Sequence, residues 1–172
     1  RIIALAVEEL YADRLPEHYD VLAYHFSKAE EWTKALQYLL KAAEKASNSF
    51  ANREAIALYD QALETAGHLG DVVRVETVMA IHEAKANLHF VLSDFENARA
   101  EGERLLALAR RQGDRVKEGA ALAGMGFASF WAHDFDRALA HSARAIEVGR
   151  QVGAQALVGG GLLTTAFVHA VT

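Results

Sequence analysis

The sequence predicts an all-α fold, a right-handed superhelix of antiparallel helix hairpins (an α-solenoid) with about nine helices. The main observation is an internal repeat, in which the stretch from Leu92 to Asp114 returns in altered form between Ala132 and Gly153. Asp94-Phe95 matches Asp134-Phe135, 40 positions later. A fixed period of this size is typical of helical repeat arrays, in which each unit packs on its neighbours.

Two further observations support helices joined by short turns. The chain of 172 residues has one proline, Pro16, although proline is the residue that breaks helix interiors. Small residues also recur at a spacing of 12, which lets two helices of a hairpin approach closely, and a larger side chain there would cost about 1–3 kcal/mol. These pairs are Ala23 with Ala35, Ala43 with Ala55, Ala86 with Ala98, and Gly126 with Ala138.

Apolar residues at helical spacing place four helices in the first half of the chain. Pro16 suits the first turn of the second helix, where its missing N–H costs nothing. Ser47-Asn48-Ser49 ends the third, because these side chains compete for backbone hydrogen bonds. The expected ranges are 2–13, 16–29, 32–47 and 51–67.

Aspartate and glycine mark the helix ends in the second half. An aspartate before a helix accepts a hydrogen bond from a free backbone N–H of the first turn. The expected caps are Asp71 for a fifth helix over about 71–92, Asp94 for the sixth and Asp134 for the eighth. Gly113-Asp114 separates the sixth and seventh helices, and Gly153 precedes the ninth.

Composition narrows the class of protein. The net charge of −5, without a long basic run, argues against a nucleic-acid partner, whose phosphates require Lys and Arg. No apolar run is long enough to span a membrane. The absence of cysteine excludes disulfides and thiolate zinc sites, and we expect a cytoplasmic location.

The titratable residues predict neither an enzyme nor a metal site. His82 and His89, like His18 and His25, lie seven residues apart on one helical face. Two turns separate such residues by roughly 10 Å, which is too far for a single ion, so we expect packed histidines. No cofactor is expected, because Gly159-Gly160-Gly161 lacks the Lys-Ser/Thr that follows a phosphate-binding loop.

One acidic stretch, His133-Asp134-Phe135-Asp136, has the form of a carboxylate site. The matching Ser93-Asp94-Phe95-Glu96 favours a simpler interpretation, namely a helix cap, a buried aromatic ring and an acid favoured by the helix dipole. We therefore expect no catalytic residue in this stretch.

One segment of the chain resembles a known repeat family. Tyr19-x2-Leu22-Ala23-x2-Phe26, followed by Ala35-x3-Leu39-x2-Ala42, is similar to the tetratricopeptide (TPR) pattern. The sequence departs from that family in its longer period and in lacking the proline between repeats. The resemblance implies one TPR-like domain over 1–172, a fragment of a longer chain. Its hairpin units would be roughly 16–48, 33–68, 71–113, 115–153 and a truncated 155–172, with the third helix shared by the first two.

A narrower resemblance concerns the residues from Tyr11 to Phe26 and from Trp32 to Ala46. These are similar to the segment after the ATPase module in bacterial STAND-type signalling proteins, which carry a nucleotide cyclase or a DNA-binding output domain. The resemblance implies a non-catalytic regulatory domain that binds a protein, a peptide or another domain of its own chain. An alternative is a small-ligand sensor that controls the attached ATPase, cyclase or DNA-binding module.

If the fifth, seventh and ninth helices are the first helices of their hairpins, as in TPR arrays, their inner face forms an aromatic surface. Such surfaces often hold a peptide or a partner domain in that family, and an apolar partner fits this one better than an acidic tail. The alternative is that these rings only fill the core between repeats. The expected partner-binding residues are Asn87, Phe90, Val91, Phe127, Phe130, Trp131 and Phe167.

The ninth helix provides a second candidate surface. We expect several of its apolar residues to need a next hairpin to cover them, because leaving a Leu or Phe exposed costs roughly 1.5–3 kcal/mol. We therefore expect a homodimer through this helix. The residues expected to mediate it are Leu157, Leu162, Leu163 and Val168.

Overall fold

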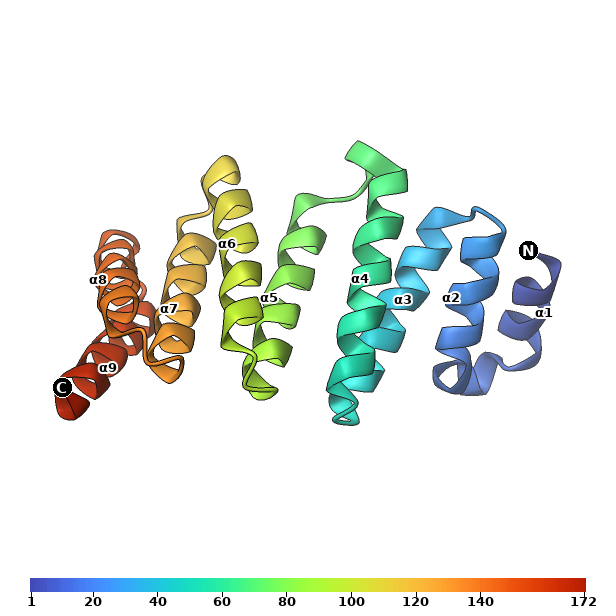
Figure 1. The fold of residues 1–172 in the computed structure, drawn as a ribbon. Helices are drawn as coiled ribbons and strands as arrows, with labels where there is room; N and C mark the ends of the chain where they lie inside the picture. The colour runs from blue at the N-terminus through green and yellow to red at the C-terminus, as the bar shows by residue number, and fades with distance from the viewer. The chain divides into compact units, whose positions relative to one another are not determined.

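The structure is a computed structural model that describes the backbone of residues 1–172 and every side chain except that of Asp71. Within this described part the chain forms nine α-helices and two 3-10 segments, which confirms the predicted all-α class (Figure 1). The helices are α1 (Ile2–Leu10), α2 (Tyr19–Lys28), α3 (Trp32–Asn48), α4 (Asn52–Leu69), α5 (Val75–Val91), α6 (Phe95–Gln112), α7 (Arg115–Trp131), α8 (Phe135–Val152) and α9 (Gln155–Val171). The 3-10 segments are η1 (Ala12–His18) and η2 (Gly70–Val72).

The chain divides into two compact units, Arg1–Ile81 and His82–Thr172, here called unit 1 and unit 2. Each unit consists of helices that lie side by side and alternate in direction (Figure 1). The single domain over 1–172 and the right-handed superhelix stay predictions.

Unit 1 is built around α3, which packs against both α2 and α4. This double contact agrees with the expectation that the third helix belongs to two hairpins. Its core includes Leu22 and Phe26 of α2 and Tyr38 of α3, and the rings of Phe26 and Tyr38 stack with centroids 5.7 Å apart. Lys34 Nζ and Tyr38 Oη of α3 each lie 2.5 Å from the carboxylate of Glu8 in α1. These two contacts attach α1 to the core.

The second helix begins later than expected. Pro16 lies inside the 3-10 segment η1, and α2 starts at Tyr19. A proline disfavours the α conformation in the residue before it, here Leu15. The chain is also kinked one residue earlier, at Arg14, which has the non-helical angles φ −132°, ψ 26°. The placement of Pro16 in the first turn of α2 is therefore wrong.

The fifth helix also starts later than expected, at Val75 rather than after Asp71. Gly70 has φ +54°, and the chain forms the short segment η2 before α5 begins. The cap expected from the Asp71 side chain lies outside the described residues.

In unit 2, α6, α7, α8 and α9 pack in sequence, and α7 also contacts α9. The aspartate caps at Asp94 and Asp134 are confirmed, since their carboxylates accept from the backbone N–H groups of Asn97 (3.3 Å) and Arg137 (3.2 Å). Asp114 caps α7 in the same way, through the N–H of Lys117 at 2.9 Å.

The same turn precedes α6 and α8. Ser93 and His133 have φ +59° and +61°, in the left-handed region. The N–H groups of the next residues, Asp94 and Asp134, reach back five residues to carbonyl oxygens at 2.8 and 2.9 Å, which closes the helix end as in a Schellman motif. Because both turns are alike, the first residues of α6 and α8 occupy equivalent places.

Small residues bring α7 and α8 close together. A Cβ atom added at Gly126 would lie 2.7 Å from Ser142 Oγ and 3.3 Å from the carbonyl oxygen of Ala138. The contact confirms the close approach expected from the spacing of Gly126 and Ala138.

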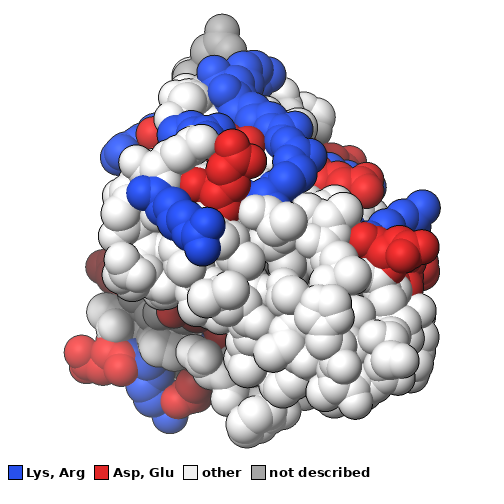
Figure 2. Space-filling model, turned by 90° about the vertical axis from the view of Figure 1, so that its left-hand side faces the viewer, with Lys and Arg blue, Asp and Glu red and all other residues white. Residues whose placement is uncertain are grey.

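The helix α9 has an uncharged outer surface. Its 17 residues include no Asp, Glu, Lys or Arg. Figure 2 looks onto the side of unit 2 that carries α8 and α9 and shows a broad uncharged area beside a band of charged side chains.

Candidate partner-binding surface

The predicted aromatic residues of α5, α7 and α9 lie in one connected row in unit 2. Ring centroids are 5.1 Å apart between Phe90 and Phe127, 6.2 Å between Phe127 and Trp131, and 5.7 Å between Trp131 and Phe130. Phe130 in turn lies 5.5 Å from Phe167 of α9. These separations are in the range of favourable aromatic contacts, so the rings hold one another in place.

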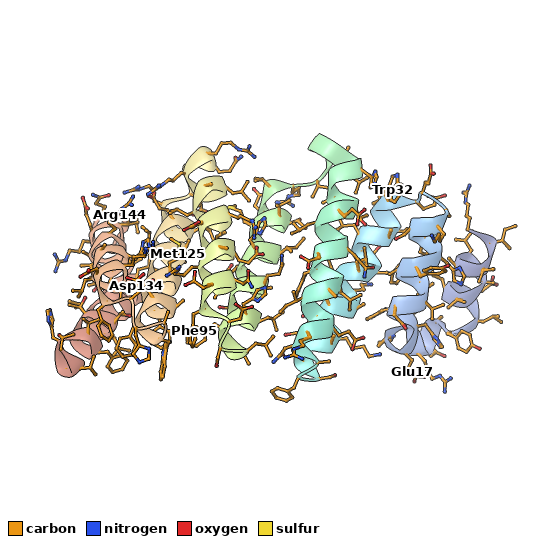
Figure 3. The ribbon with its side chains drawn as sticks, viewed as in Figure 1. Glu17, Trp32, Phe95, Met125, Asp134 and Arg144 are labelled. Carbon is orange, nitrogen blue, oxygen red and sulfur yellow. The ribbon has the colours of Figure 1, made fainter. Side chains whose placement is uncertain are left out.

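Two phenylalanines that the sequence interpretation left out also join this row. Phe95 lies 5.5 Å from Phe90, and Phe135 lies 6.1 Å from Phe130. Each is the first residue of its helix, directly after the capping aspartate, and Figure 3 shows Phe95 near that end of α6. The signal that could have found them is their match in the internal repeat, 40 positions apart. We use "aromatic row" for Phe90, Phe95, Phe127, Phe130, Trp131, Phe135 and Phe167.

The aromatic row is partly buried and partly open to solvent. Trp131 is 48% exposed and Phe167 is 37% exposed, whereas Phe90, Phe127 and Phe130 are half-buried. The rings therefore pack between helices and still present apolar area on the surface. The interpretation as a partner-binding surface and the interpretation as filling between repeats therefore each describe part of the row.

A pocket of about 320 Å³ adjoins the row between α5, α6 and α7. Phe90 and Phe127 line it, and small residues such as Ala98, Gly102 and Gly124 make up much of the rest of the lining. Met125, which Figure 3 shows on α7, also borders it. Because these side chains are short, the helices leave room for an apolar group from outside.

The polar groups of the pocket are few. The Glu83 carboxylate forms an ion pair with Lys117, so its charge is balanced within the protein. Asn87 is exposed on α5 and also lines the pocket, where its amide can donate and accept hydrogen bonds. Among the residues that line it, Glu83 is the one that carries a charge. The pocket is therefore suited to an uncharged group.

A buried ion cluster links α5 to α6 beside this pocket. Glu101, which is 3% exposed, lies 2.7 Å from His82 Nδ1 and 2.6 Å from Lys85 Nζ. Burial alone would raise the pKa of Glu101, but the hydrogen bonds from His82 and Lys85 and the charges of Lys85 and Arg104 outweigh it and lower the pKa to about 2. The cluster therefore holds α5, which carries Asn87 and Phe90, against α6, which contributes Gly102 and Leu105 to the pocket lining.

Val91 differs from the other expected partner-binding residues. It is 65% exposed at the end of α5 and lies outside the residues that line the pocket. Asn87, Phe90 and Phe127 line the pocket directly, while Phe130, Trp131 and Phe167 extend the surface toward α9. The structure thus brings six of the seven expected residues into one continuous surface.

The four residues expected to mediate self-association face different ways. Leu162 and Leu163 are exposed, at 49% and 52%. Leu157 is half-buried and points toward α7, since its Cδ1 atom would lie 2.5 Å from a Cβ atom added at Gly119. Val168 is 1% exposed. The expectation that Val168 is exposed is wrong, because it lies on the face of α9 that packs inside unit 2.

Two of the histidines contact acidic side chains of unit 2. His82 is bonded to Glu101, and His89 Nδ1 lies 3.1 Å from Asp94 Oδ2. In the part of the chain that the structure describes, no group of three or more His, Cys, Asp or Glu side chains could hold a metal ion.

Comparison with known proteins adds no assignment. No family model matches the sequence, and no curated protein is significantly similar to it. Among the described residues, no helix combines the length and apolar character needed to cross a membrane.

Proposed function

We propose that this chain is a non-catalytic, TPR-like interaction domain of a larger bacterial signalling protein. Its partner is a protein or peptide, or another domain of the same chain, and it binds on the surface formed by the aromatic row and the adjoining pocket. The observation that carries the proposal is the continuity of that surface, from the pocket at Asn87 to the exposed rings of Trp131 and Phe167.

The chemistry of this surface favours an apolar partner. Large aromatic side chains such as Trp131 contribute most of the binding energy in many protein interfaces. An acidic tail would need a free cation in the groove, but Lys117 is already paired with Glu83. An apolar side chain instead fills the pocket beside Phe90 and Phe127, while the Asn87 amide bonds to the backbone of the partner.

The second candidate function is the sensing of a small ligand, which would control an attached ATPase, cyclase or DNA-binding module. The observation that favours it is the pocket of about 320 Å³, which lies within the range of small-molecule sites. A ligand at 100 times its dissociation constant should stabilise the folded chain by about 2.7 kcal/mol. A rise in melting temperature with a small molecule, but with no peptide, would favour this alternative.

The proposed function is tested by selecting binders from a random peptide library on the whole chain and measuring their affinity by calorimetry. Selected peptides are expected to be rich in apolar residues and poor in Asp and Glu. Two variants should weaken binding at least tenfold. Gly124→Leu fills the pocket from a position where a Cβ atom meets nothing within 4 Å, and Trp131→Ala removes the most exposed ring of the row.

The matched control is Tyr24→Ala, which removes a ring that is 58% exposed in unit 1. This variant should bind the selected peptides as the unchanged protein does. Peptides that bind both pocket variants with unchanged affinity would place the interaction elsewhere. A library without any binder would contradict a peptide partner.

The signalling assignment has its own test, which is to read the coding sequence on both sides of this chain. A Gly-x4-Gly-Lys-Ser/Thr loop upstream, together with a cyclase or DNA-binding domain, would support it. Neighbours made only of helical hairpins would overturn it and indicate a scaffold protein.

A further inference from the structure

The pocket beside the aromatic row is elongated along the helices. On α5 its lining runs from Glu83 to Phe90, which corresponds to about 10 Å along the helix axis. On α7 the lining includes Gly124, where an added Cβ atom would meet nothing within 4 Å. The backbone of α7 is therefore open to the pocket there, and a planar group can lie flat against it.

Two rings and a thioether in the lining favour an aromatic occupant over an aliphatic one. The rings of Phe90 and Phe127 stack with centroids 5.1 Å apart and planes inclined by 25°, and a third ring can extend this pair. Met125 also lines the pocket, and its sulfur can make a favourable contact with a ring edge. An aliphatic side chain would bury its surface without gaining either contact.

The volume of the pocket indicates more than one ring. An apolar protein cavity of about 150 Å³ is large enough to bind benzene. The pocket measures about 320 Å³, so a single phenyl ring would leave roughly half of it unfilled. Unfilled space deprives the lining of dispersion contacts, so a fused two-ring group fits the pocket better.

The polar side chains of the lining select the kind of two-ring group. Glu83 and Asn87 are the polar residues among those that line the pocket, and the Glu83 carboxylate is already paired with Lys117. The Asn87 amide is uncharged, and its oxygen can accept a hydrogen bond from a ring N–H. Indole is the group that combines two fused aromatic rings, no charge and one N–H donor.

We propose that this pocket binds an indole ring, carried by a tryptophan of the partner protein or peptide. The inference rests on the proposed function, since it names the group with which an apolar partner occupies the surface. The ring lies against Gly124 and beside Phe127, and its N–H donates to Asn87 Oδ1. Tryptophan is also among the residues that most often dominate the binding energy of protein interfaces.

NMR titration of the whole chain with indole and with 1-methylindole tests the chemistry of the pocket. Indole is expected to shift the resonances of the Gly124 backbone amide and the Asn87 side-chain amide. It should bind about tenfold more tightly than 1-methylindole, because methylation removes the only donor. In Asn87→Leu the two compounds should bind equally. Gln37→Leu, which removes an exposed amide of α3, is the matched control and should keep the difference.

Peptides test whether the indole belongs to a partner. Binders selected from the random library should share a tryptophan. Replacing it with 1-methyltryptophan should weaken binding to the unchanged protein about tenfold and binding to Asn87→Leu very little, because the two changes remove the same hydrogen bond.

Three results would overturn the inference. They are equal binding of indole and 1-methylindole by the unchanged protein, a tenfold difference that persists in Asn87→Leu, and selected peptides that bind through leucine or methionine without tryptophan. The third result leaves the proposed function intact, since a peptide still occupies the surface. Indole binding without any peptide binder would overturn the tryptophan partner together with the peptide partner, and would favour the sensing of a small ligand.

Discussion

Glu101 shows how a single buried side chain supports the candidate surface. Its carboxylate lies between His82 and Lys85 of α5, and Arg104 Nη1 is 2.7 Å away. A buried charge of this kind is stable only when its partners are close, and removing one member of such a group costs several kcal/mol. The geometry of the pocket wall on α5 therefore depends on this carboxylate.

The low pKa of Glu101 predicts a specific loss of stability in acid. Because the folded-state pKa of about 2 lies below the ordinary value of 4.5, the stabilisation is fully present above about pH 4.5 and is lost as the pH falls toward 2. The loss attributable to Glu101 should approach about 3 kcal/mol, because a tenfold change in a proton-binding constant corresponds to about 1.36 kcal/mol. Denaturant unfolding of the unchanged protein and of Glu101→Gln, from pH 7 to pH 2, measures it.

The variant should be less stable at pH 7 and should lose less stability than the unchanged protein on acidification. Glu103→Gln serves as the control, since Glu103 is exposed on the same helix. Parallel pH curves for Glu101→Gln and the unchanged protein would contradict the role given to this carboxylate.

At the scale of single elements, the glycines of α9 show that neighbouring positions of one helix meet opposite surroundings. A Cβ atom added at Gly161 would lie 2.6 Å from Ile146 Cγ1 and 2.9 Å from the carbonyl oxygen of Ser142 on α8. One added at Gly160 would meet nothing within 4 Å. The same chemical change should therefore have opposite effects at these two positions.

We predict that Gly161→Ala destabilises the chain by about 1–3 kcal/mol, because the carbonyl group of Ser142 cannot move without shifting α8. Gly160→Ala should stabilise it by up to about 1 kcal/mol through helix propensity alone. Thermal or urea unfolding of both variants, at a concentration where the chain is monomeric, checks the signs. Stabilisation by Gly161→Ala would show that α8 and α9 are further apart than the structure has them.

On the scale of the whole molecule, the division at Ile81 and His82 predicts two unfolding units. The two tryptophans report on them separately, since Trp32 lies in unit 1 and Trp131 in unit 2. Leu22 and Leu122, one in each unit, are both 0% exposed. Replacing a fully buried leucine by alanine costs about 2–5 kcal/mol.

In a chain with Trp131 as its only tryptophan (Trp32→Phe), Leu122→Ala should shift the fluorescence transition strongly, and Leu22→Ala should shift it little. The reverse is expected when Trp32 is the only tryptophan (Trp131→Phe), because contacts in repeat arrays are mostly between neighbours. Equal shifts of both reporters by both substitutions would show that residues 1–172 unfold as one cooperative domain.

Helices and caps were the features most accessible from the sequence. Periodic apolar residues placed α3 within a few positions, and the aspartate and glycine signals placed the ends of α6, α7 and α8. The caps at Asp94 and Asp134 followed from a local hydrogen bond between a side chain and its own first turn. The errors at Pro16 and at the start of α5 concern segments where a proline or a glycine changes the backbone over a few residues. Such short segments lack the regular spacing of apolar residues from which a helix boundary could be predicted.

The sequence by itself determined which residues share a face of a helix, because that depends only on the 100° turn per residue. It therefore placed Asn87 and Phe90 on one face of α5, whereas their grouping with Phe127 of α7 came from the resemblance to TPR arrays. Only the tertiary structure decided which helix covers which face. It buried Val168, turned Leu157 toward Gly119, brought Phe95 and Phe135 into the aromatic row and surrounded Glu101 with cations. These outcomes depend on how closely neighbouring helices approach, which is set by residues far apart in the chain.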